Sequence, residues 1–333
     1  MNRLRFALAA FAVLGGIACL AAAAPPSPGD HEFVVSVAGF ERRYIVHLPP
    51  NRAAQPAVVL NFHGGGSNPR QHRDYVHMDP QADRAGFIVV YPYGSGFFRE
   101  RLLTWNAGSC CGWAKRENVD DVGFVRALLA DLARRVDYDP RRVYATGLSN
   151  GAMMSYRLAV ELPQAIAAIA PVGGGMVIGT GVPSTAKPVL HIHSTDDPRA
   201  LYEGGLGPPF PLTNVRVLHP SVEAGLALWA RANGCTGPMQ ATTRHEWTDA
   251  HGRLHTATLL QYSGCRVETA LWRLSGAGHV WPGGTLDYLP RILGPGTRVI
   301  DANVEIWRFF ARQRLETVPG AGAGGLETRQ ARN

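Results

Sequence analysis

The five residues from Gly147 to Gly151 read G-L-S-N-G and place a serine hydroxyl where it could act as a nucleophile. The pattern G-x-S-x-G is typical of a serine held on a sharp turn between a strand and a helix, because glycines two positions before and after it leave room for a crowded backbone. A β-like segment precedes Ser149, and a helical pattern rich in alanine, methionine and leucine follows it. Serine is also a preferred N-cap residue, so the pattern alone leaves both interpretations open.

A serine alcohol is a weak nucleophile that needs a base, and the base needs an acid to orient it. Downstream of Ser149, Asp196 and Asp197 follow a predicted strand, and His279 lies in a glycine-rich loop after another strand. The order serine, acid, histidine is that of α/β-hydrolases, and strand-end loops are where open α/β sheets build their sites. We therefore expect His279 as the base and Asp197 as the acid, with Asp196 as the alternative.

A second glycine-rich turn, at 63–66, reads H-G-G-G and follows the predicted strand at 57–62. Such a turn can aim a backbone N–H at the oxyanion of an attacked carbonyl, together with the N–H of Asn150, the residue after the serine. The alternative is a merely flexible turn. His63 lies upstream of the serine, so we expect it to be structural rather than the base.

These residues need a scaffold of alternating strands and helices, and the sequence predicts one. Runs rich in valine, isoleucine and phenylalanine predict strands at 33–37, 43–48, 57–62, 87–91, 142–146, 166–172, 189–193 and 270–274. Helices are predicted at 121–136, 221–233 and 303–314, a hairpin at 245–262, and a long loop that could cover a site at 199–220. The predicted fold class is therefore α/β, with a mostly parallel central sheet and helices on both faces.

Composition favours one large globular domain. The chain has 333 residues, of which 46% are apolar and 18% charged, enough for a substantial core and inconsistent with a disordered chain. No internal repeat or linker divides it. The formal charge is +7, but arginines are scattered along the chain, so no nucleic-acid partner is expected.

The N-terminus predicts an export signal over residues 1–24. Two arginines precede an apolar run, and small residues follow it. A membrane anchor is an alternative, but the run is short, rich in alanine and followed by Pro-Pro. Lipid attachment at Cys19 is a further alternative. We expect a catalytic domain at 25–315 in a secreted or periplasmic protein without stable membrane insertion, and a disordered tail at 316–333.

Four cysteines follow the predicted signal, and an even number in an exported chain favours disulfides. Cys235 and Cys265 lie in similar turn contexts, so we expect them to pair. Cys110 and Cys111 are adjacent, where a mutual bond would strain the chain, and the sequence leaves their state open.

The predicted chemistry needs neither a metal nor an organic cofactor. His191 and His193 point to one face of a predicted strand and could imitate a metal-binding pair, but no third ligand is evident. No C-x-x-C spacing accompanies the cysteines either.

Several motifs follow one another along roughly residues 30–315; they read FHGGG, RAGFIVVYPYG, WNAGSCCG, DDVGFV, VYATGLSNGAMMSYRLA, HIHSTDDP, NGC and GAGHVWPGG. Together they resemble the motifs of the polyhydroxybutyrate depolymerase and feruloyl esterase group of secreted α/β-hydrolases. GLSNGAMM and GHVWPGG are far more specific than G-x-S-x-G alone. The resemblance implies an α/β-hydrolase fold and an esterase activity.

Carried over position by position, the resemblance implies Ser149 as nucleophile, Asp197 as acid and His279 as base. Family members usually show H-G-T-A-D-P, and its alignment on 193–198 selects Asp197 rather than Asp196.

The same alignment implies that the N–H groups of Gly65 and Asn150 bind the oxyanion. It also places Trp281 beside the base as a candidate pocket wall. Trp105 and Trp281 could seat an aromatic acid or stack on a sugar, and with equal weight they could be core residues.

The expected function is that of a secreted serine esterase acting on 3-hydroxybutyrate polymers or oligomers, with feruloyl or acetyl-xylan esters of plant cell walls as the alternative. Family members often continue with V-V-P-Y where residues 199–202 read R-A-L-Y, so the acyl specificity is not carried over. No separate substrate-binding domain is evident after the catalytic one, which favours short oligomers over crystalline polymer. A distant alternative is a non-catalytic binding protein on this scaffold, but no member of the expected triad is missing.

Overall fold

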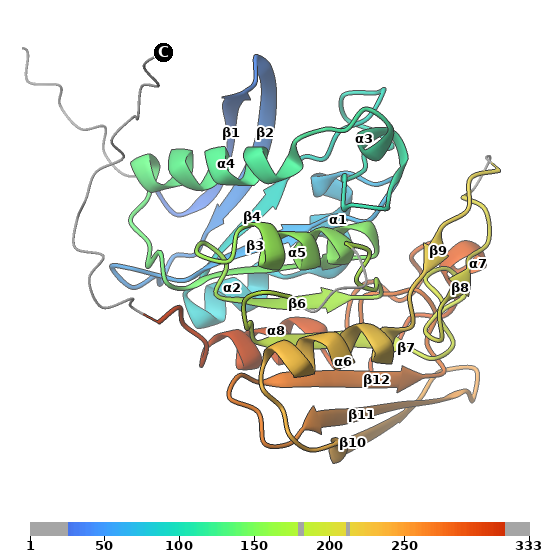
Figure 1. The fold of residues 1–333 in the computed structure, drawn as a ribbon. Helices are drawn as coiled ribbons and strands as arrows, with labels where there is room; N and C mark the ends of the chain where they lie inside the picture. The colour runs from blue at the N-terminus through green and yellow to red at the C-terminus, as the bar shows by residue number, and fades with distance from the viewer. Residues whose placement is uncertain (1–25, 179–182, 211–213, 317–333) are drawn as a thin grey trace, which may run out of the picture.

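One ten-stranded sheet runs through the part of the protein that the computed structural model describes, residues 26–178, 183–210 and 214–316 (Figure 1). Its strands follow the order β1-β2-β4-β3-β5-β6-β7-β12-β11-β10. Their bounds are β1 Gly29–Val37, β2 Phe40–Leu48, β3 Val58–Phe62, β4 Ile88–Pro92, β5 Val143–Leu148, β6 Ala168–Val172, β7 Val189–Ser194, β10 Met239–Thr248, β11 Leu254–Tyr262 and β12 Thr269–Ser275. Two further short strands, β8 (Gly205–Leu206) and β9 (Leu218–His219), pair with each other inside the predicted loop at 199–220.

The six central strands β4, β3, β5, β6, β7 and β12 are parallel. The β1–β2 hairpin adds antiparallel strands at one side, and the β10–β11 hairpin adds them at the other. The carboxyl ends of the parallel strands therefore meet at a single edge of the sheet, where α/β proteins place their sites. The predicted fold class, α/β with a mostly parallel sheet, is confirmed.

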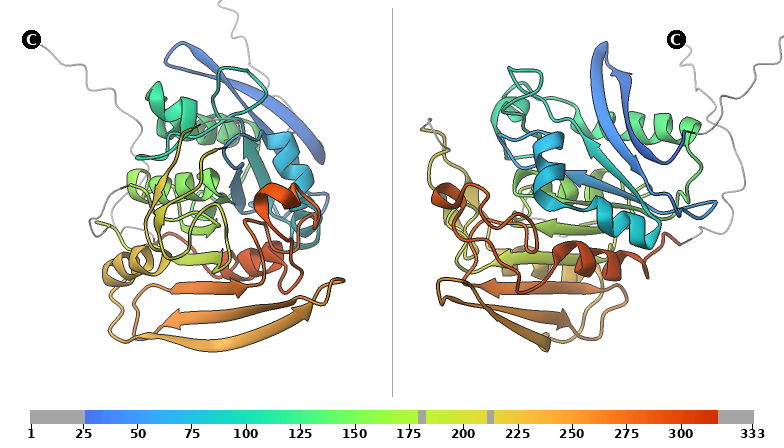
Figure 2. Two further views of the ribbon diagram at one scale, coloured as in Figure 1. Left: turned by 90° about the vertical axis from the view of Figure 1, so that its right-hand side faces the viewer. Right: turned by 180° about the vertical axis from the view of Figure 1, so that it is seen from behind.

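Helices cover both faces of this sheet (Figure 2). Their bounds are α1 Pro69–Val76, α2 Asp79–Ala85, α3 Gly112–Arg116, α4 Asp121–Arg135, α5 Asn150–Glu161, α6 Val222–Ala232, α7 Pro290–Leu293 and α8 Ala302–Phe310. α4, α5 and α6 pack on one face, and α1, α2 and α8 pack on the other. The short helices α3 and α7 and the β8–β9 pair lie beyond the carboxyl ends of the strands (Figure 1).

The buried side chains form two cores, one on each face of the sheet. In β3, Leu60 and Phe62 pack with the core under α4, α5 and α6, whereas Val59 packs with the core under α1, α2 and α8. In β4, Val90 packs with the first of these cores and Val89 with the second. Because both faces are covered, the central strands are continuous apolar runs, and this is why the sequence reveals them.

Several predicted elements differ in extent from those observed, and the strand predicted from residue 33 already begins at Gly29. The hairpin predicted at 245–262 begins earlier, because β10 already starts at Met239. The helix predicted to reach Arg314 ends at Phe310. Beyond that point the Arg314 guanidinium pairs with the Asp139 carboxylate at 2.7 Å, which draws the chain toward the start of β5.

Two disulfides lie within the described residues. Cys235 and Cys265 are bonded, as predicted, and join the end of α6 to the connection between β11 and β12. Cys110 and Cys111, whose state the sequence leaves open, are bonded to each other and linked by a cis peptide bond. Both are buried, and the N–H of Cys111 donates to the carbonyl of Trp105 at 3.0 Å.

The predicted signal peptide at 1–24, with Cys19, lies outside the described residues, as does all but the first residue of the predicted tail at 316–333. The domain boundaries at 25 and 315 stay predictions. In the ranges that the structure describes, none of the helices has the length and apolar character needed to cross a bilayer.

Candidate active site

Loops at the carboxyl ends of neighbouring parallel strands bring the predicted site residues to one edge of the sheet. Gly65 follows β3, Ser149 follows β5, Asp197 follows β7 and His279 follows β12. β6 lies between β5 and β7 and ends just before Gly173. The site is therefore assembled from segments that are distant in the sequence, and the sheet supplies their common position.

Ser149 occupies the sharp turn between β5 and α5. Its φ of 57° and ψ of −117° lie outside the regions that residues with a Cβ usually adopt. Its N–H donates to the carbonyl of Val172 at 2.9 Å, and its own carbonyl accepts from the N–H of Met153 at 3.0 Å. Although Ser149 stands at the N-cap position of α5, its side chain makes no capping hydrogen bond. The geometry thus favours the nucleophile over the N-cap interpretation.

The glycines of the G-L-S-N-G segment are required by the close approach of β3. A Cβ at Gly147 or Gly151 would collide with the carbonyl oxygen of Phe62, the last residue of β3. A Cβ at Gly64 would lie 3.6 Å from the Cβ of Ser149. The glycine-rich turn after β3 therefore packs directly against the serine turn, and side chains on the motif glycines would push the two apart.

Asp197 is 4% exposed, and both of its carboxylate oxygens accept hydrogen bonds. Oδ1 accepts from the N–H groups of Arg199 at 2.8 Å and Ala200 at 2.9 Å. Oδ2 accepts from the Nδ1–H of His279 at 2.6 Å. Burial by itself would raise the pKa of Asp197, but the charge of His279 and the hydrogen bonds from His193 and His279 outweigh it and hold the pKa well below its usual range. The carboxylate therefore stays ionised.

His279 is fixed in the loop after β12, where its N–H donates to the carbonyl of Leu293 at 2.6 Å. A Cβ at Gly173 would lie 3.5 Å from the imidazole of His279, and a Cβ at Gly174 would collide with the carbonyl of Ser149. The two glycines after β6 therefore lie between the histidine and the serine turn. Gly174 has no room for a side chain, and Gly173 has a φ of 58°, which disfavours any other residue.

Asp196, the alternative acid, has a different partner. Its Oδ2 accepts from the N–H of Gly276 at 2.5 Å and so ties the loop after β7 to the loop after β12. The imidazole of His279 bonds to Asp197 instead. The geometry favours Asp197 over Asp196 as the acid.

The N–H groups of Gly65 and Asn150 flank the serine turn. A Cβ at Gly65 would lie 3.5 Å from the Cβ of Asn150, and neither N–H donates to a carbonyl or side chain among the described residues. Asn150 begins α5, where backbone N–H groups have no partner within the helix. Its side chain is clamped by Trp105, whose N–H donates to Oδ1 at 2.7 Å and whose carbonyl accepts from Nδ2 at 3.1 Å. Two free donors therefore lie beside Ser149.

His63 fixes the shape of the glycine-rich turn. Its Nδ1–H donates to the carbonyl of Gly64 at 2.8 Å, and its Nε2 accepts from the N–H of Gly94 at 3.0 Å. Burial lowers the pKa of His63 to about 4, so the ring is neutral. The indole N–H of Trp105 donates to the carbonyl of His63 at 2.9 Å. The contacts with Gly64 and Gly94 occupy both ring nitrogens of His63.

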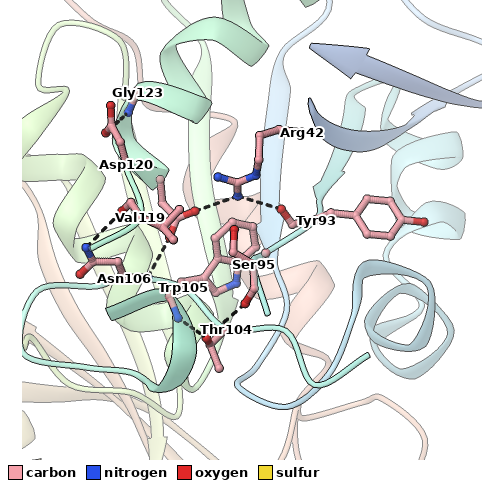
Figure 3. A network of polar contacts seen from close by, with 12 residues as sticks. Arg42, Tyr93, Ser95, Thr104, Trp105, Asn106, Val119, Asp120 and Gly123 are labelled. Carbon is pink, nitrogen blue, oxygen red and sulfur yellow. Dashed lines mark hydrogen bonds and ion pairs between the residues drawn. The ribbon is translucent and has the colours of Figure 1, made fainter. Parts of the chain in front are cut away.

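A buried ion pair anchors the segment that carries Trp105. The guanidinium of Arg42 donates to Asp121 at 2.8 Å and to the carbonyl of Tyr93 at 3.1 Å (Figure 3). Asp121 also accepts from the N–H of Asn106 at 2.8 Å. The two charged side chains are 9% and 0% exposed. Burial raises the pKa of Asp121 even though Arg42 and the Asn106 N–H act to lower it.

Trp105 and Trp281, the predicted substrate contacts, are 0% and 1% exposed. Trp105 packs edge-on against Phe62 with ring centroids 5.1 Å apart. The indole N–H of Trp281 donates to the side chain of Asn303 at 3.1 Å. These surroundings are those of core residues, the other predicted alternative, and substrate contact by either tryptophan stays a prediction.

Two histidines lie near Asp197 without a predicted role in the site. The Nε2 of His193 is 3.2 Å from the Oδ2 of Asp197, whereas the sequence shows only that His191 and His193 alternate along a strand. His219, in β9, is partly buried; burial lowers its pKa to about 4, and its Nδ1 has no partner within the described ranges. A single histidine in a loop rich in glycine and proline carries no signal that would have revealed it.

One group of three described side chains has the spacing of a metal site, namely Asp30, His47 and Asp79 on the β1–β2 side of the sheet. Arg73 pairs with both carboxylates of this group. The imidazole Nε2 of His47 is bonded to Asp83 at 2.9 Å. Ion pairs already satisfy these groups.

The parallel sheet carries a serine on a strained strand-to-helix turn, and an acid and a histidine follow it in sequence at later strand ends. This combination defines an α/β-hydrolase. Residues 42–233 match the family described as Esterase PHB depolymerase, and the chain belongs to that family. The resemblance noted in the sequence is thereby confirmed, and the protein is a carboxylic-ester hydrolase.

Two relatives of known sequence extend this comparison. A protein of Nocardia uniformis subsp. tsuyamanensis, NocK, which is named as an esterase, is 30% identical over 274 residues, 79% of this chain and 77% of that protein. Feruloyl esterase B of Piromyces equi is 27% identical over 248 residues, 72% of this chain. This second match spans only 42% of the fungal protein.

Solved structures show the same fold. An acetyl xylan esterase from Aspergillus awamori superposes with a TM-score of 0.52 at 15% identity, and the match covers 75% of this chain and 94% of that one. At this identity the likeness concerns the arrangement of the chain and not the substrate.

Proposed function

We propose that the protein is a serine esterase that hydrolyses carboxylic esters through an acyl-enzyme on Ser149. The observation that carries the proposal is the 2.6 Å hydrogen bond between buried Asp197 and His279, at the same sheet edge as the strained turn of Ser149. Because the Nδ1 of His279 is held by Asp197, its Nε2 is the atom left to act as the base.

In the first half of the reaction, the Oγ of Ser149 attacks the ester carbonyl while the Nε2 of His279 takes its proton. The negative charge that develops on the carbonyl oxygen is stabilised by the N–H groups of Gly65 and Asn150. The ionised carboxylate of Asp197 holds the imidazole in its tautomer and stabilises the imidazolium. The imidazolium then gives its proton to the leaving alcohol, and the acyl group remains on the serine.

In the second half, water attacks the acyl-enzyme and His279 again acts as the base. The tetrahedral intermediate uses the same two N–H donors, and its collapse returns the proton to Ser149 and releases the acid. None of these steps requires a metal or an organic cofactor.

For the substrate, we propose esters of 3-hydroxybutyrate, as polymer or oligomer. The family's description supports this choice. A hollow of about 410 Å³ adjoins the glycine-rich turn and is lined by Gly66, Gln71, Phe98, Arg101 and Leu102. Phe98 and Leu102 are 54% and 61% exposed, so the hollow offers apolar surface beside Gly66, the residue that follows the proposed donor Gly65, as an aliphatic polyester segment would need.

Feruloyl or acetyl-xylan esters are the alternative substrates. The name of the Piromyces equi relative favours feruloyl esters. An aromatic acid would also find an apolar partner in the ring of Phe98. The two proposals therefore differ in which ester is cleaved and share the chemistry on Ser149.

A panel of substrates distinguishes them: hydroxybutyrate oligomers, polymer film, methyl ferulate, acetylated xylan and short nitrophenyl esters. We expect the highest kcat/KM on the hydroxybutyrate oligomers. Pretreatment with a fluorophosphonate should abolish all of these activities and leave the phosphonyl group on the Ser149 peptide in a mass spectrum. A higher kcat/KM on methyl ferulate or acetylated xylan would replace the polyester assignment, and label on another residue would reject the mechanism.

We also propose that the protein is exported. The arginines, apolar run and small residues before position 24 support this, as does the Cys235–Cys265 disulfide, since such bonds persist in oxidising compartments. The N-terminal sequence of protein recovered from the periplasm or medium should begin near residue 25. Recovery of the full-length chain from the cytoplasm alone would contradict export.

A further inference from the structure

A row of buried polar side chains leads from the interior of the protein to the proposed acid. Tyr156 lies on α5, His191 and His193 lie on β7, and Asp197 follows β7. Their exposed fractions are 2%, 0%, 3% and 4%. Polar groups are costly to bury unless they are hydrogen-bonded, so each side chain in this row is expected to have hydrogen-bond partners.

Each neighbour in the row is within hydrogen-bond distance of the next. The hydroxyl oxygen of Tyr156 is 2.9 Å from the Nδ1 of His191, and the Nε2 of His191 is 2.9 Å from the Nδ1 of His193. The Nε2 of His193 is 3.2 Å from the Oδ2 of Asp197 and 2.8 Å from the carbonyl oxygen of Ala200. Both ring nitrogens of each histidine therefore have a partner.

The chemistry of the last partners fixes the position of one proton on His193. A carboxylate and a carbonyl only accept, so the Nε2 of His193 must carry the proton. With this single proton on the His193 ring, its Nδ1 accepts from the Nε2–H of His191, and the Nδ1 of His191 accepts from the hydroxyl of Tyr156. In this arrangement the donors run from Tyr156 to His193, whose Nε2–H bonds to the carbonyl of Ala200 at 2.8 Å and lies 3.2 Å from the Oδ2 of Asp197.

Burial keeps the far end of the row neutral. It raises the pKa of Tyr156, and it lowers that of His191 far below the ordinary value, with the nearby His193 acting in the same direction. Four other titratable or charged groups are packed around His193 and Asp197: Arg199 and Tyr202 in the loop after β7, His219 in β9, and His279 in the loop after β12.

We propose that Tyr156, His191 and His193, here named the donor chain, position Asp197 and set the basicity of His279. The inference rests on the proposed function, because it assigns Asp197 and His279 the roles of acid and base. The donor chain shares the Oδ2 of Asp197 with His279, so it withdraws negative charge from the oxygen that holds the imidazole. Hydrogen bonds in series also polarise one another, which strengthens the last donor. The three residues are positioning residues and do not touch the substrate.

His193→Phe tests the donor chain, because it keeps a ring of similar size and removes the last donor. We expect kcat to fall by about 10- to 100-fold with little change in KM, by analogy with the loss of residues that orient metal ligands. With one donor fewer, Asp197 attracts the imidazolium proton more strongly. The acidic limb of the kcat/KM profile should therefore move to higher pH by several tenths of a unit, a fraction of the roughly 1–2 units that a charge-assisted hydrogen bond is worth.

Three further variants make the test decisive. His193→Gln keeps a donor and should leave the acidic limb near its wild-type position. Tyr156→Phe removes one hydroxyl from the far end and should move the limb in the same direction by a smaller amount. Tyr144→Phe is the matched control, since it removes a buried hydroxyl that donates to the carbonyl of Gln313 at 2.6 Å, outside the donor chain. It should lower the melting temperature and leave the acidic limb unchanged.

An unchanged acidic limb in folded His193→Phe overturns the inference, even if its melting temperature falls. If His193→Phe does not fold, Tyr156→Phe decides, and an unchanged limb in that variant overturns it too. Wild-type protein is measured in parallel for fluorophosphonate-sensitive esterase activity. If the wild-type protein lacks this activity, the proposed function is rejected. If the activity is present and the acidic limb of the variants does not move, only the donor chain is rejected.

Discussion

Replacing Ser149 by alanine is expected to lower kcat/KM for ester hydrolysis by roughly 10⁵- to 10⁶-fold, the size of effect seen when a triad nucleophile is removed. The variant loses the atom that forms the acyl-enzyme, so the imidazole of His279 has no proton to take. It keeps the N–H groups of Gly65 and Asn150, and a residual rate about 10³–10⁴ above that of water is expected from the oxyanion donors and binding alone.

Ser155→Ala is the control for this loss. Ser155 lies on the same helix and its hydroxyl donates to the carbonyl of Gly151 at 3.0 Å, so the variant removes a buried hydroxyl without reaching the reacting atoms. It should retain kcat/KM within a few-fold of wild type. Steady-state rates on a nitrophenyl ester, with circular dichroism to verify folding, provide the measurement. Full activity in Ser149→Ala would exclude the acyl-enzyme mechanism.

Arg42→Met is expected to cost about 3–5 kcal/mol of the free energy of unfolding at pH 7, because it leaves the fully buried carboxylate of Asp121 without its partner. The carboxyl group would have to take up a proton, and each pH unit above its ordinary pKa of about 3.9 costs about 1.4 kcal/mol. Because the folded variant then binds a proton that its unfolded state has lost, its deficit should shrink as the pH falls from 7 to 5.

Arg43→Met separates this effect from the loss of any arginine on β2. Arg43 pairs with Glu32 and Glu100 at the surface, where such a pair contributes about 0–1 kcal/mol. The double variant Arg42→Met/Asp121→Asn should recover most of the lost stability, since no unpaired buried charge remains. Urea midpoints at constant slope measure all three variants. Equal losses for Arg42→Met and Arg43→Met, or a deficit that grows toward pH 5, would disprove the buried-charge account.

Much of the site could be predicted because its signals are local. The glycines around Ser149 and the glycine turn after His63 reflect backbone crowding, which leaves a mark in a few adjacent residues. The order of Ser149, Asp197 and His279 needs only the knowledge that each follows a strand. The α/β fold is visible in the same way, because doubly covered strands are apolar throughout.

What could not be predicted depends on contacts across the sheet. No local pattern pairs Arg42 with Asp121, since the two lie in different elements and meet only when α4 packs beside β2. The alternation of His191 and His193 is visible, but their partners lie on α5 and in the loop after β7. The burial of Trp105 and Trp281 likewise depends on how far the surrounding loops cover the strand ends, and sequence periodicity does not report on that.

The adjacency of β7 and β12 in the sheet has a consequence for the order in which the protein folds. The hydrogen bond between Asp197 and His279 joins positions 82 residues apart, and α6 and the β10–β11 hairpin lie between them in the sequence. Contacts between residues so far apart in the sequence form slowly, because the entropy of closing a long loop is lost before the contacts contribute favourable free energy. A chain in which β3, β5 and β6 have already paired would hold Ser149 and its glycine turn in place and would still lack a base. Regained activity after refolding therefore reports the docking of the last strands, and helical structure can recover before it.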